Sequence, residues 1–488
     1  MTGHLHSDHI KAAPRTFDLA RLPATELIAG YRAGTFTPVD VIDDVIGALE
    51  ATDALCNVVV TDMYEAARRE AERTSSAWAK AEAIGPLAGV PVTIKDLLFV
   101  AGVGAHAGAP TLADFVPDQD SAAVSALKAA GAVLTCKTTT CESGYKLTAD
   151  SPLSGVTRNP WRLDRTSGGS SGGAAAAVAA GCGPLAIGTD AVGSIRVPSS
   201  FCGVFGLKPT FGLVPRSPSF FPPSWGSLAH TGPIGRTVAD VALLLEVVAG
   251  YDVRDAASLP VEKRQFEIRA ASLAPLKIAV TPDFGFAVVA PAVRDAFAEV
   301  AHALANLNAD IVPLEPSLGT RLLEEVLQPI GFTEQAAAVM YREPADLALS
   351  EPEFQAVVAK GRAVRGIDYV DALHKRARLR GRFLDIFKSV DAIITPTVAV
   401  TAFAAGTIGV DMIDGRPVDR HLGWSPFSWP INLAGLPAAT VPCGFDQDGM
   451  PIGFQIVAPW LEENTIFRIA AAFEQARPWA GHWPSFAR

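Results

Sequence analysis

The sequence predicts an α/β protein, because segments with strand and helix patterns alternate along its 488 residues. Residues 39–50 follow a Thr-Pro pair typical of a helix start and carry apolar side chains at the spacing of one helix face. Residues 87–94 form an apolar run typical of a buried strand, and a helical pattern over 121–130 and a strand pattern over 132–136 follow. This strand–helix–strand order is typical of α/β folds.

The second half of the chain continues the alternation. We expect strands at 276–280, 311–314, 392–395, 438–441 and 452–457, and helices at 238–248, 291–307, over most of 320–390 and at 463–475. No internal repeat and no low-complexity linker separates these segments. The basic run at 375–382 falls in the helical region, where a solvated helix face is favoured over a nucleic-acid contact.

Composition argues against several classes of protein. Hydrophobic residues make up 49% of the chain and charged residues 19%, which is ample material for a sizeable core. A net charge of −10 without a basic stripe argues against nucleic acid or an anionic membrane as the main partner. Because the chain has no run of 18 apolar residues and no signal-peptide core at its start, we expect a soluble, cytoplasmic protein.

The cysteines and the N-terminal histidines favour neither disulfides nor a metal site. The six cysteines lie far apart without a CxxC pair, so buried free thiols in a reducing compartment are the favoured interpretation. Residues 1–15 have the composition of a loose arm. His4, His6 and His9 in this arm are better explained by a solvated tail than by a metal site.

Two glycine- and serine-rich loops flank an alanine-rich helical segment in the middle of the chain. The first loop covers 167–173 and the second 188–194, and the segment between them begins with an uncharged run at 174–180. Glycine permits close backbone approaches, and the start of a helix presents unpaired N–H groups. Each loop therefore carries a candidate nucleophile: Ser170 or Ser171 in the first and Ser194 in the second.

Lys95 is a second candidate for chemistry. It ends the apolar strand at 87–94, where burying an amine is costly. By itself the position favours a lysine that reaches the surface along its methylene chain. No histidine stands in a recognised triad context and no GxSxG motif is present, so a histidine-based serine triad is not indicated.

The stretch 166–210, TSGGSSGGAAAAVAAGCGPLAIGTDAVGSIRVPSSFCGVFGLKPT, resembles the signature of the amidase signature family of serine hydrolases. GVPVTIKD at 89–96 is similar to the lysine strand of that family, and TRNPW at 157–161 to the lead-in of its glycine loop. GLPAATVP at 435–442 and GMPIGFQ at 449–455 resemble its closing strands. The likeness covers roughly residues 25–480.

The resemblance implies a fold and a division of the chain. It implies a large, mixed, twisted β-sheet with helices on both faces. We expect one domain over 16–488, with a helical N-terminal part at about 16–85, the signature core at about 86–250 and a second α/β and helical portion at about 251–488.

The resemblance also implies a catalytic triad of Lys95, Ser170 and Ser194, with a cis peptide bond before Ser170. In this family the nucleophilic serine, here Ser194, is acylated, and the bridging serine, here Ser170, relays protons to and from the lysine. Lysine can act as the base when burial lowers its pKa, because only a neutral amine accepts a proton. The expected oxyanion donors are the backbone N–H groups of Ala191, Val192, Gly193 and Ser194.

The sequence departs from the family pattern at two places. Val192 stands where the family usually has glycine, and a β-branched residue needs an ordinary backbone conformation. Ala105 and His106 stand about where the family often has two threonines, so His106 is either a substrate contact or a structural histidine. Asp190 and Arg196 match family positions and are interpreted as a supporting pair.

The expected reaction is hydrolysis of the C–N bond of a small neutral acyl or aryl amide, through an acyl-enzyme, to a carboxylic acid and ammonia or an amine. The stretches 220–225 and 423–429 are aromatic and uncharged, and we expect them to line the pocket. The Pro- and aromatic-rich segment 211–230 is either a lid over that pocket or a surface loop. Candidate substrate contacts are Tyr145, His106, Trp225 and Trp424. No metal or organic cofactor is implied.

Three alternatives stay open at this point. The family includes the glutaminase (A) subunit of tRNA-dependent amidotransferases, but residues 137–145 differ from the run typical of that subunit, which favours a free-standing amidase. A phosphate-binding module would use a glycine loop at a helix start, but the GxxxxGK[ST] pattern is absent from this loop. An inactive scaffold would not need all three triad residues. Family members are often dimers, and the sequence leaves the oligomeric state open.

Overall fold

The computed structural model describes residues 18–485 apart from 83, 263, 267, 269–271, 315–317 and 320. The N-terminal arm at 1–15, with His4, His6 and His9, therefore lies outside the described residues. None of the helices in the described ranges is long and apolar enough to cross a lipid bilayer. The six cysteines form no disulfide: five are buried and Cys443 is half-buried.

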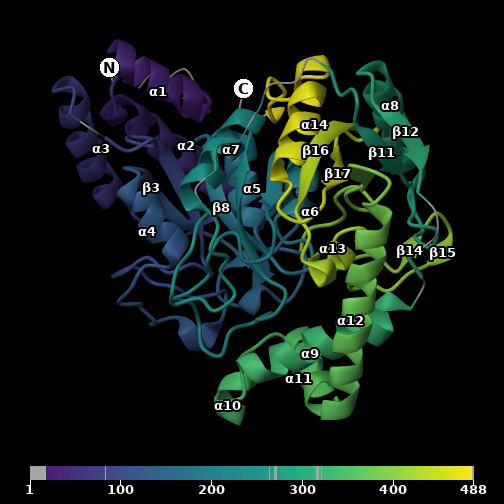
Figure 1. The fold of residues 1–488 in the computed structure, drawn as a ribbon. Helices are drawn as coiled ribbons and strands as arrows, with labels where there is room; N and C mark the ends of the chain where they lie inside the picture. Colours follow the sequence, from purple (N-terminus) through teal and green to yellow (C-terminus); the bar gives the residue numbers. More distant parts are fainter. Residues whose placement is uncertain are drawn as a thin grey trace, which may run out of the picture.

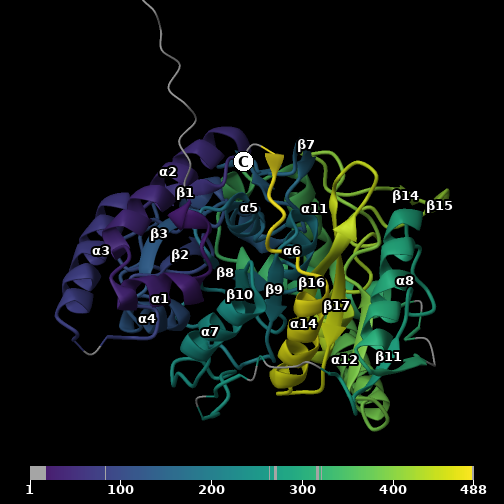
Figure 2. The ribbon, with the colours of Figure 1, turned by 90° about the horizontal axis from the view of Figure 1, so that it is seen from above.

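A mixed sheet of 11 strands runs through the molecule (Figures 1 and 2). Its strands, in spatial order, are β1 (Val59–Asp62), β3 (Val133–Thr138), β2 (Pro91–Lys95), β8 (Leu185–Asp190), β10 (His230–Gly235), β9 (Phe205–Lys208), β16 (Ala438–Phe445), β17 (Pro451–Val457), β13 (Ala392–Pro396), β11 (Lys277–Val280) and β12 (Asp310–Pro313). Strands β3, β2 and β8 are parallel neighbours, as are β13, β11 and β12, whereas β10, β9, β16 and β17 pair antiparallel. The α/β class and the mixed sheet predicted from the sequence are confirmed.

Helices cover both faces of this sheet, as Figure 2 shows. One face carries α2 (Pro38–Cys56), α5 (Gly172–Ala180) and α6 (Arg196–Cys202), and the other carries α1 (Ala24–Ala33), α4 (Ala122–Ala129), α7 (Val238–Val248) and α14 (Glu463–Ala476). Helix α3 (Tyr64–Ala79) packs on α2 and β3, and α8 (Pro291–Asn306) packs on the strands at the opposite end of the sheet.

The expected Thr-Pro helix start is observed at α2, where Thr37 Oγ1 accepts a hydrogen bond from the Asp40 N–H and Pro38 is the first helical residue. The apolar run at 87–94 forms a strand only from Pro91. Its first residues make a turn, with the Val90 N–H donating to the Leu87 carbonyl.

A group of helices projects away from the sheet at the bottom of Figure 1. It contains α9 (Gln328–Ala338), α10 (Pro344–Leu347), α11 (Pro352–Ala363) and the lower part of α12 (Gly366–Ile386). We call this group the helical projection. The helical projection lies between β12 and β13 in the sequence. It is therefore far along the chain from the glycine- and serine-rich loops.

Short elements complete the described chain. They are α13 (Trp429–Ala434), the 3-10 turns Leu19–Arg21, Pro110–Leu112 and Glu142–Gly144, a π-helical turn Leu323–Leu327, and the two-stranded pairs β4 (Asp150–Ser151) with β5 (Gly155–Val156), β6 (Arg158–Asn159) with β7 (Arg162–Thr166), and β14 (Met412–Ile413) with β15 (Arg416–Pro417). The sequence-based expectation of one domain over 16–488, with its three parts, stays a prediction.

Candidate active site

The parallel pair β2 and β8 places the candidate residues at one edge of the sheet. Lys95 is the last residue of β2, and Asp190 is the last residue of β8. Ser170 and Ser171 immediately precede α5, which packs on both strands. The loop after β8 then carries Ser194 to the same edge, and the Ser171 N–H donates to the Ser194 carbonyl at 3.0 Å. The fold therefore brings Lys95, Ser170 and Ser194 together.

The Lys95 amine is fully buried and contacts three hydroxyl groups. Its Nζ lies 2.7 Å from Ser170 Oγ, 2.9 Å from Ser171 Oγ and 2.9 Å from Thr189 Oγ1. The Thr189 carbonyl lies 3.3 Å away. No carboxylate of the described residues forms a salt bridge with Lys95. The surface-reaching alternative for this lysine is therefore wrong.

These contacts allow the lone pair of a neutral Lys95 amine to face Ser170. Ser171 Oγ donates its own hydrogen to the Thr189 carbonyl at 3.1 Å, so it can only accept from Lys95. Thr189 Oγ1 can accept the second amine hydrogen. The remaining lone pair then faces the hydroxyl of Ser170. Deprotonated Lys95 is thus placed to take a proton from Ser170.

Burial also favours that neutral form. It lowers the pKa of Lys95 to about 7, because a charged amine is poorly solvated there, and the more distant Cys141 and Asp190 only partly oppose the shift. An amine with a pKa near neutrality can both accept and return a proton.

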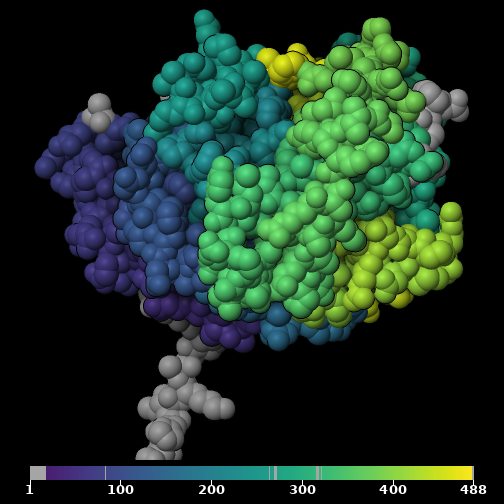
Figure 3. Space-filling model, turned by 90° about the horizontal axis from the view of Figure 1, so that it is seen from below, coloured from purple at the N-terminus to yellow at the C-terminus, as the bar shows by residue number. Residues whose placement is uncertain are grey.

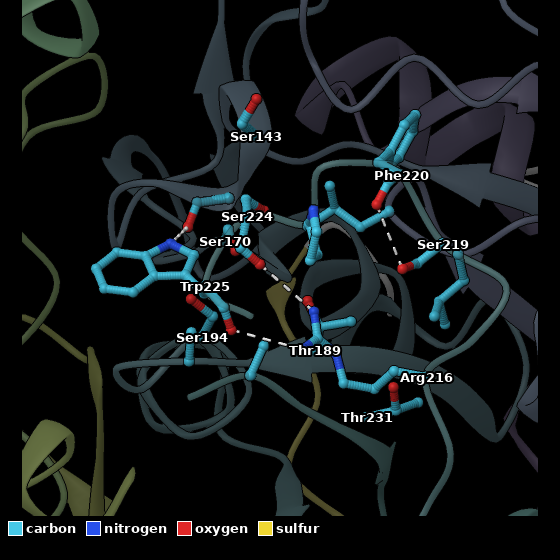
Figure 4. Close-up of a pocket in the computed structure, with 16 residues that line it drawn as sticks. Ser143, Ser170, Thr189, Ser194, Arg216, Ser219, Phe220, Ser224, Trp225 and Thr231 are labelled. Carbon is cyan, nitrogen blue, oxygen red and sulfur yellow. Dashed lines mark hydrogen bonds between the residues drawn. The ribbon is translucent and has the colours of Figure 1, made fainter. Parts of the chain in front are cut away.

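The two serines lie in one pocket and differ in their hydrogen bonds. The peptide bond between Gly169 and Ser170 is cis, as the resemblance implies. Ser170 Oγ is bound to Lys95, whereas Ser194 Oγ is buried without a hydrogen-bond partner among the described residues. An unpartnered buried hydroxyl is costly unless something else binds it. Both serines face the pocket drawn in Figure 4.

The loop from Asp190 to Ser194 offers three open backbone donors. Gly193 adopts φ = +132°, which suits glycine, while Val192 keeps a negative φ and its side chain is buried in the core. The Gly193 N–H donates to Asp190 Oδ1 at 2.8 Å, so it is not available to an oxyanion. The hydrogen bonds of the described residues include none from the N–H groups of Ala191, Val192 and Ser194. The prediction for Gly193 as a donor therefore needs correction.

A buried ion pair braces this loop. Arg196 Nε and NH2 each lie 2.9 Å from the Asp190 carboxylate, and both side chains are fully buried. Asn432 Nδ2 donates to Asp190 Oδ1 at 2.9 Å, and Arg196 NH1 donates to Gln455 Oε1 at 2.6 Å. Burial alone would raise the pKa of Asp190, but Arg196 holds it below its ordinary value. The supporting role predicted for Asp190 and Arg196 agrees with these contacts.

The pocket beside the serines is walled largely by the segment 216–225. Its lining includes Leu97, Leu98, Ser143, Gly144, Ser170, Thr189, Ala191, Ser194, Arg216, Ser219, Phe220, Pro223, Ser224, Trp225, Ala229 and Thr231. Figure 4 shows Trp225 on the same side as Ser194, with its indole Nε1 donating to the Gly144 carbonyl at 3.0 Å. Of the two interpretations of segment 211–230, the structure favours the one in which it covers the pocket.

Three of the four predicted substrate contacts lie away from the pocket lining. The His106 backbone N–H donates to Asp96 Oδ2 at 3.0 Å, and its ring packs beside that carboxylate. Tyr145 packs against Phe354, with ring centres 5.1 Å apart. Trp424 is fully buried and stacks on Phe201. Only Trp225 lines the pocket, and no residue of 423–429 does, because that aromatic stretch packs in the core.

Sequence reasoning missed Thr189 and Arg216. Thr189 precedes Asp190 in β8, and only the parallel pairing with β2 reveals its contact with Lys95. Among the described residues that line the pocket, Arg216 is the one ionisable side chain, and its guanidinium donates to the carbonyls of residues 224–226 at 3.2–3.5 Å. The sequence of 211–230 gave no indication that Arg216 would line the pocket and bind these carbonyls.

Comparison with known proteins connects this site to a family. A family model described as Amidase matches residues 40–467. The chain is a member of the amidase signature family. An acylamidase from Rhodococcus erythropolis is 34% identical over 472 residues, which cover 95% of this chain and 97% of that protein. The A subunit of glutamyl-tRNA(Gln) amidotransferase from Synechococcus sp. (strain CC9605) is 36% identical over 480 residues, with 91% and 94% covered.

Solved structures of amidase signature proteins share the fold. A bacterial aryl acylamidase superposes with a TM-score of 0.88 at 28% identity, covering 95% of this chain and 98% of that one. The A subunit of the glutamyl-tRNA(Gln) amidotransferase from Thermotoga maritima superposes with a TM-score of 0.77 at 27% identity, covering 96% and 98%. The amidase signature chain described here is thus an enzyme that hydrolyses amide bonds.

Proposed function

We propose that this amidase hydrolyses small uncharged acyl or aryl amides through an acyl-enzyme on Ser194. The observation that carries the proposal is the buried Lys95 amine, which lies 2.7 Å from Ser170 Oγ and has a pKa lowered by burial to about 7. In the first step Ser194 Oγ attacks the amide carbon, and its proton passes through Ser170 to Lys95. The negative charge on the carbonyl oxygen is stabilised by the N–H groups of Ala191, Val192 and Ser194.

The remaining steps return the same proton. Lys95 gives it back through Ser170 to the leaving nitrogen, the C–N bond breaks, and ammonia or an amine departs. Water then attacks the acyl carbon while the Ser170–Lys95 relay removes its proton, and the carboxylic acid leaves Ser194. Each step needs only groups on this chain, the substrate and water.

The character of the pocket supports an uncharged substrate. The described residues of its lining include no carboxylate and a single guanidinium, that of Arg216, which is already bound to three carbonyls of its own wall. The other polar groups are hydroxyls of serine and threonine, set between leucine, phenylalanine and tryptophan side chains. Such a lining suits an apolar acyl or aryl group attached to an amide.

The test is release of ammonia or arylamine from a panel of neutral and anionic amides by wild type and Ser194→Ala. We expect wild type to favour neutral amides and Ser194→Ala to lose roughly 10⁴- to 10⁶-fold in kcat. The exposed Ser389→Ala serves as the matched control and should act like wild type. A preference for anionic amides would contradict the substrate class, and an active Ser194→Ala would contradict the mechanism.

The second candidate function is that of a glutaminase subunit serving a tRNA-dependent amidotransferase. The curated relatives of both kinds have similar identity to this chain, but the fold superposes better on the aryl acylamidase than on the amidotransferase subunit, with TM-scores of 0.88 and 0.77. Glutaminase activity that requires a co-purifying partner protein would favour this second function. The expectation of a homodimer stays a prediction.

A further inference from the structure

The turn Glu142–Gly144 is part of the pocket wall beside the triad. Ser143 and Gly144 both line the pocket. A Cβ atom placed on Gly144 would lie 3.4 Å from Ser170 Oγ and 3.0 Å from Leu97 Cδ1, so the backbone of Gly144 lies close to the serine. The indole of Trp225 also binds the Gly144 carbonyl. Any shift of this turn would therefore move two parts of the pocket wall.

The opposite side of this turn is held mainly by the connection between α10 and α11 of the helical projection. Lys146 Nζ lies 2.5 Å from Glu351 Oε2 and 2.6 Å from Asp150 Oδ2, and its side chain is only 3% exposed. The Glu142 carboxylate is fully buried and accepts from Ser350 Oγ at 2.5 Å and from the Glu351 N–H at 3.3 Å. The residues on both sides of Ser143–Tyr145 are thus tied to the chain just before α11.

Figure 3 shows the two parts meeting at the surface, where the green helical projection borders the blue part of the chain that leads toward the triad. In the interior, Tyr145 packs on Phe354 of α11. Arg342 NH1 lies 3.8 Å from Glu142 Oε1 and adds a positive charge to the cluster. We call Glu142, Lys146, Asp150, Arg342 and Glu351 the wall cluster.

Stability alone is a weak reason for such a cluster. Removing ionic groups from water costs several kcal/mol per ion, and a well-packed apolar substitute is often equally stable. What an ion pair with hydrogen bonds supplies is a defined geometry. Burial raises the pKa of Glu142 and of Glu351, which is consistent with that cost. None of these charges contacts Lys95, Ser170 or Ser194, so the proposed chemistry does not use them directly.

We propose that Lys146 and Glu351 are positioning residues, which hold the Ser143–Gly144 wall against Ser170 and so make the helical projection a determinant of which amides bind. The proposal rests on the assignment of Ser170 and Ser194 to the triad. It differs from a purely structural role, because loss of the ion pair should alter substrate binding more than the reactivity of Ser194.

The test compares Lys146→Met, Glu351→Gln and the double variant with Lys388→Met, which breaks the exposed pair with Asp385. KM and kcat are measured for a small and a bulky amide. Labelling of Ser194 by a small sulfonyl fluoride, located by mass spectrometry of the peptide, reports the triad separately. Thermal unfolding reports the fold, and Lys146→Arg keeps the charge if Lys146→Met does not fold.

We expect KM for the bulky amide to rise about 10-fold or more in each single variant, while the labelling rate of Ser194 stays within about 3-fold of wild type. The double variant should add little to Lys146→Met, because that single variant already loses the ion pair with Glu351. Lys146→Arg should recover most of the KM effect, and Lys388→Met should show none.

Unchanged KM values in folded variants would overturn the proposal. An equal rise in KM for both amides, together with equal losses in kcat and in labelling, would also overturn it, since it would indicate general destabilisation. Absence of labelling at Ser194 in the wild type would instead contradict the proposed triad, so the two failures are distinguishable.

Discussion

The Lys95 amine is surrounded by hydroxyl groups and one carbonyl rather than by a counter-ion. Neutral acceptors stabilise an ammonium group less than a carboxylate does, so burial controls the pKa. In the proposed mechanism, this lowered pKa lets a lysine, whose amine is ordinarily charged, act as a base near neutral pH.

The first prediction concerns the pH dependence of activity. Because Lys95 must be neutral and burial lowers its pKa to about 7, kcat/KM should rise with pH through about 7 and level off above it. The measurement is kcat/KM for a neutral amide from pH 5 to 9. A profile that falls as the pH rises through 7 would contradict the role of Lys95 as base.

The second prediction concerns Thr189, which accepts a hydrogen bond from the Lys95 amine. Thr189→Val removes that acceptor with little change in shape, which destabilises the ammonium form. The acid limb of the kcat/KM profile should therefore move to lower pH, and kcat should fall about 10-fold because the lone pair is less well directed. Ser389→Ala provides the control, and an acid limb moved to higher pH would refute the explanation.

At the scale of single residues, the triad is predicted only through the resemblance of residues 89–96 and 166–210 to the signature of the family. The sequence does not predict the partners of Lys95 beyond Ser170, because Thr189 reaches the amine only through strand pairing. Aromatic residues are the least predictable. Trp424 and Trp225 look alike in sequence, yet one stacks in the core and the other lines the pocket.

Helix α5 connects the two serine loops and is buried along its whole length. Because it consists almost entirely of glycine and alanine, the helix can approach β2, β8 and α6 closely. Of the two glycines in α5, Gly173 is the one that lies against neighbouring backbone atoms. A Cβ atom there would lie 2.6 Å from the Thr139 nitrogen and 2.9 Å from the Val58 carbonyl oxygen. The helix therefore fixes Ser170 and Ser171 at its start by close packing.

The third prediction compares two glycine substitutions in helices. Gly173→Ala should destabilise the fold by about 1–3 kcal/mol, because the surrounding backbone cannot make room for a methyl group. Gly381→Ala in α12 has open space around it and should stabilise the fold by about 0.5–1 kcal/mol. Unfolding by heat and by urea checks both, and equal effects of the two substitutions would contradict the packing argument.

Elements with strong periodicity are predicted well, and weakly patterned ones are not. Helix α7 has the predicted bounds, and α8 and α14 differ by a single residue at one end. Strands β9 and β10 were not predicted, because their glycine and proline residues interrupt any alternation. They form strands because they pair between β8 and β16 in the interior of the sheet.

Across the whole molecule, the half-buried carboxyl group of Glu474 and the buried carboxyl group of Asp240 tie the C-terminal helix to the N-terminal half. Glu474 of α14 accepts from the Val238 N–H at the start of α7 at 3.2 Å, and Asp240 accepts from the Thr25 N–H of α1 at 3.2 Å. Burial raises the pKa of Glu474 to about 7 and that of Asp240 to about 6. Both groups therefore keep their proton to a higher pH in the folded chain than in the unfolded chain.

The fourth prediction follows from this linkage. A carboxyl group whose folded pKa lies above its unfolded value stabilises the fold at low pH and loses that contribution as the pH rises. For Glu474 the loss should run from about pH 4.5 to about 7 and amount to roughly 1–3 kcal/mol. Glu474→Gln should flatten the decline in the thermal midpoint between pH 5 and 8, and an unchanged slope would refute the assignment.

The position of the helical projection in the sequence has a consequence for how the substrate range of this enzyme can evolve. The proposed chemistry resides in Lys95, Ser170 and Ser194, whereas the residues that hold Glu142 and Lys146 of the pocket wall from outside lie at 342–351. Because these are separate stretches of sequence, mutation and selection can act on one and leave the other intact. A library of variants confined to 342–351 should therefore yield enzymes with altered substrate ranges that all keep the same hydrolytic apparatus.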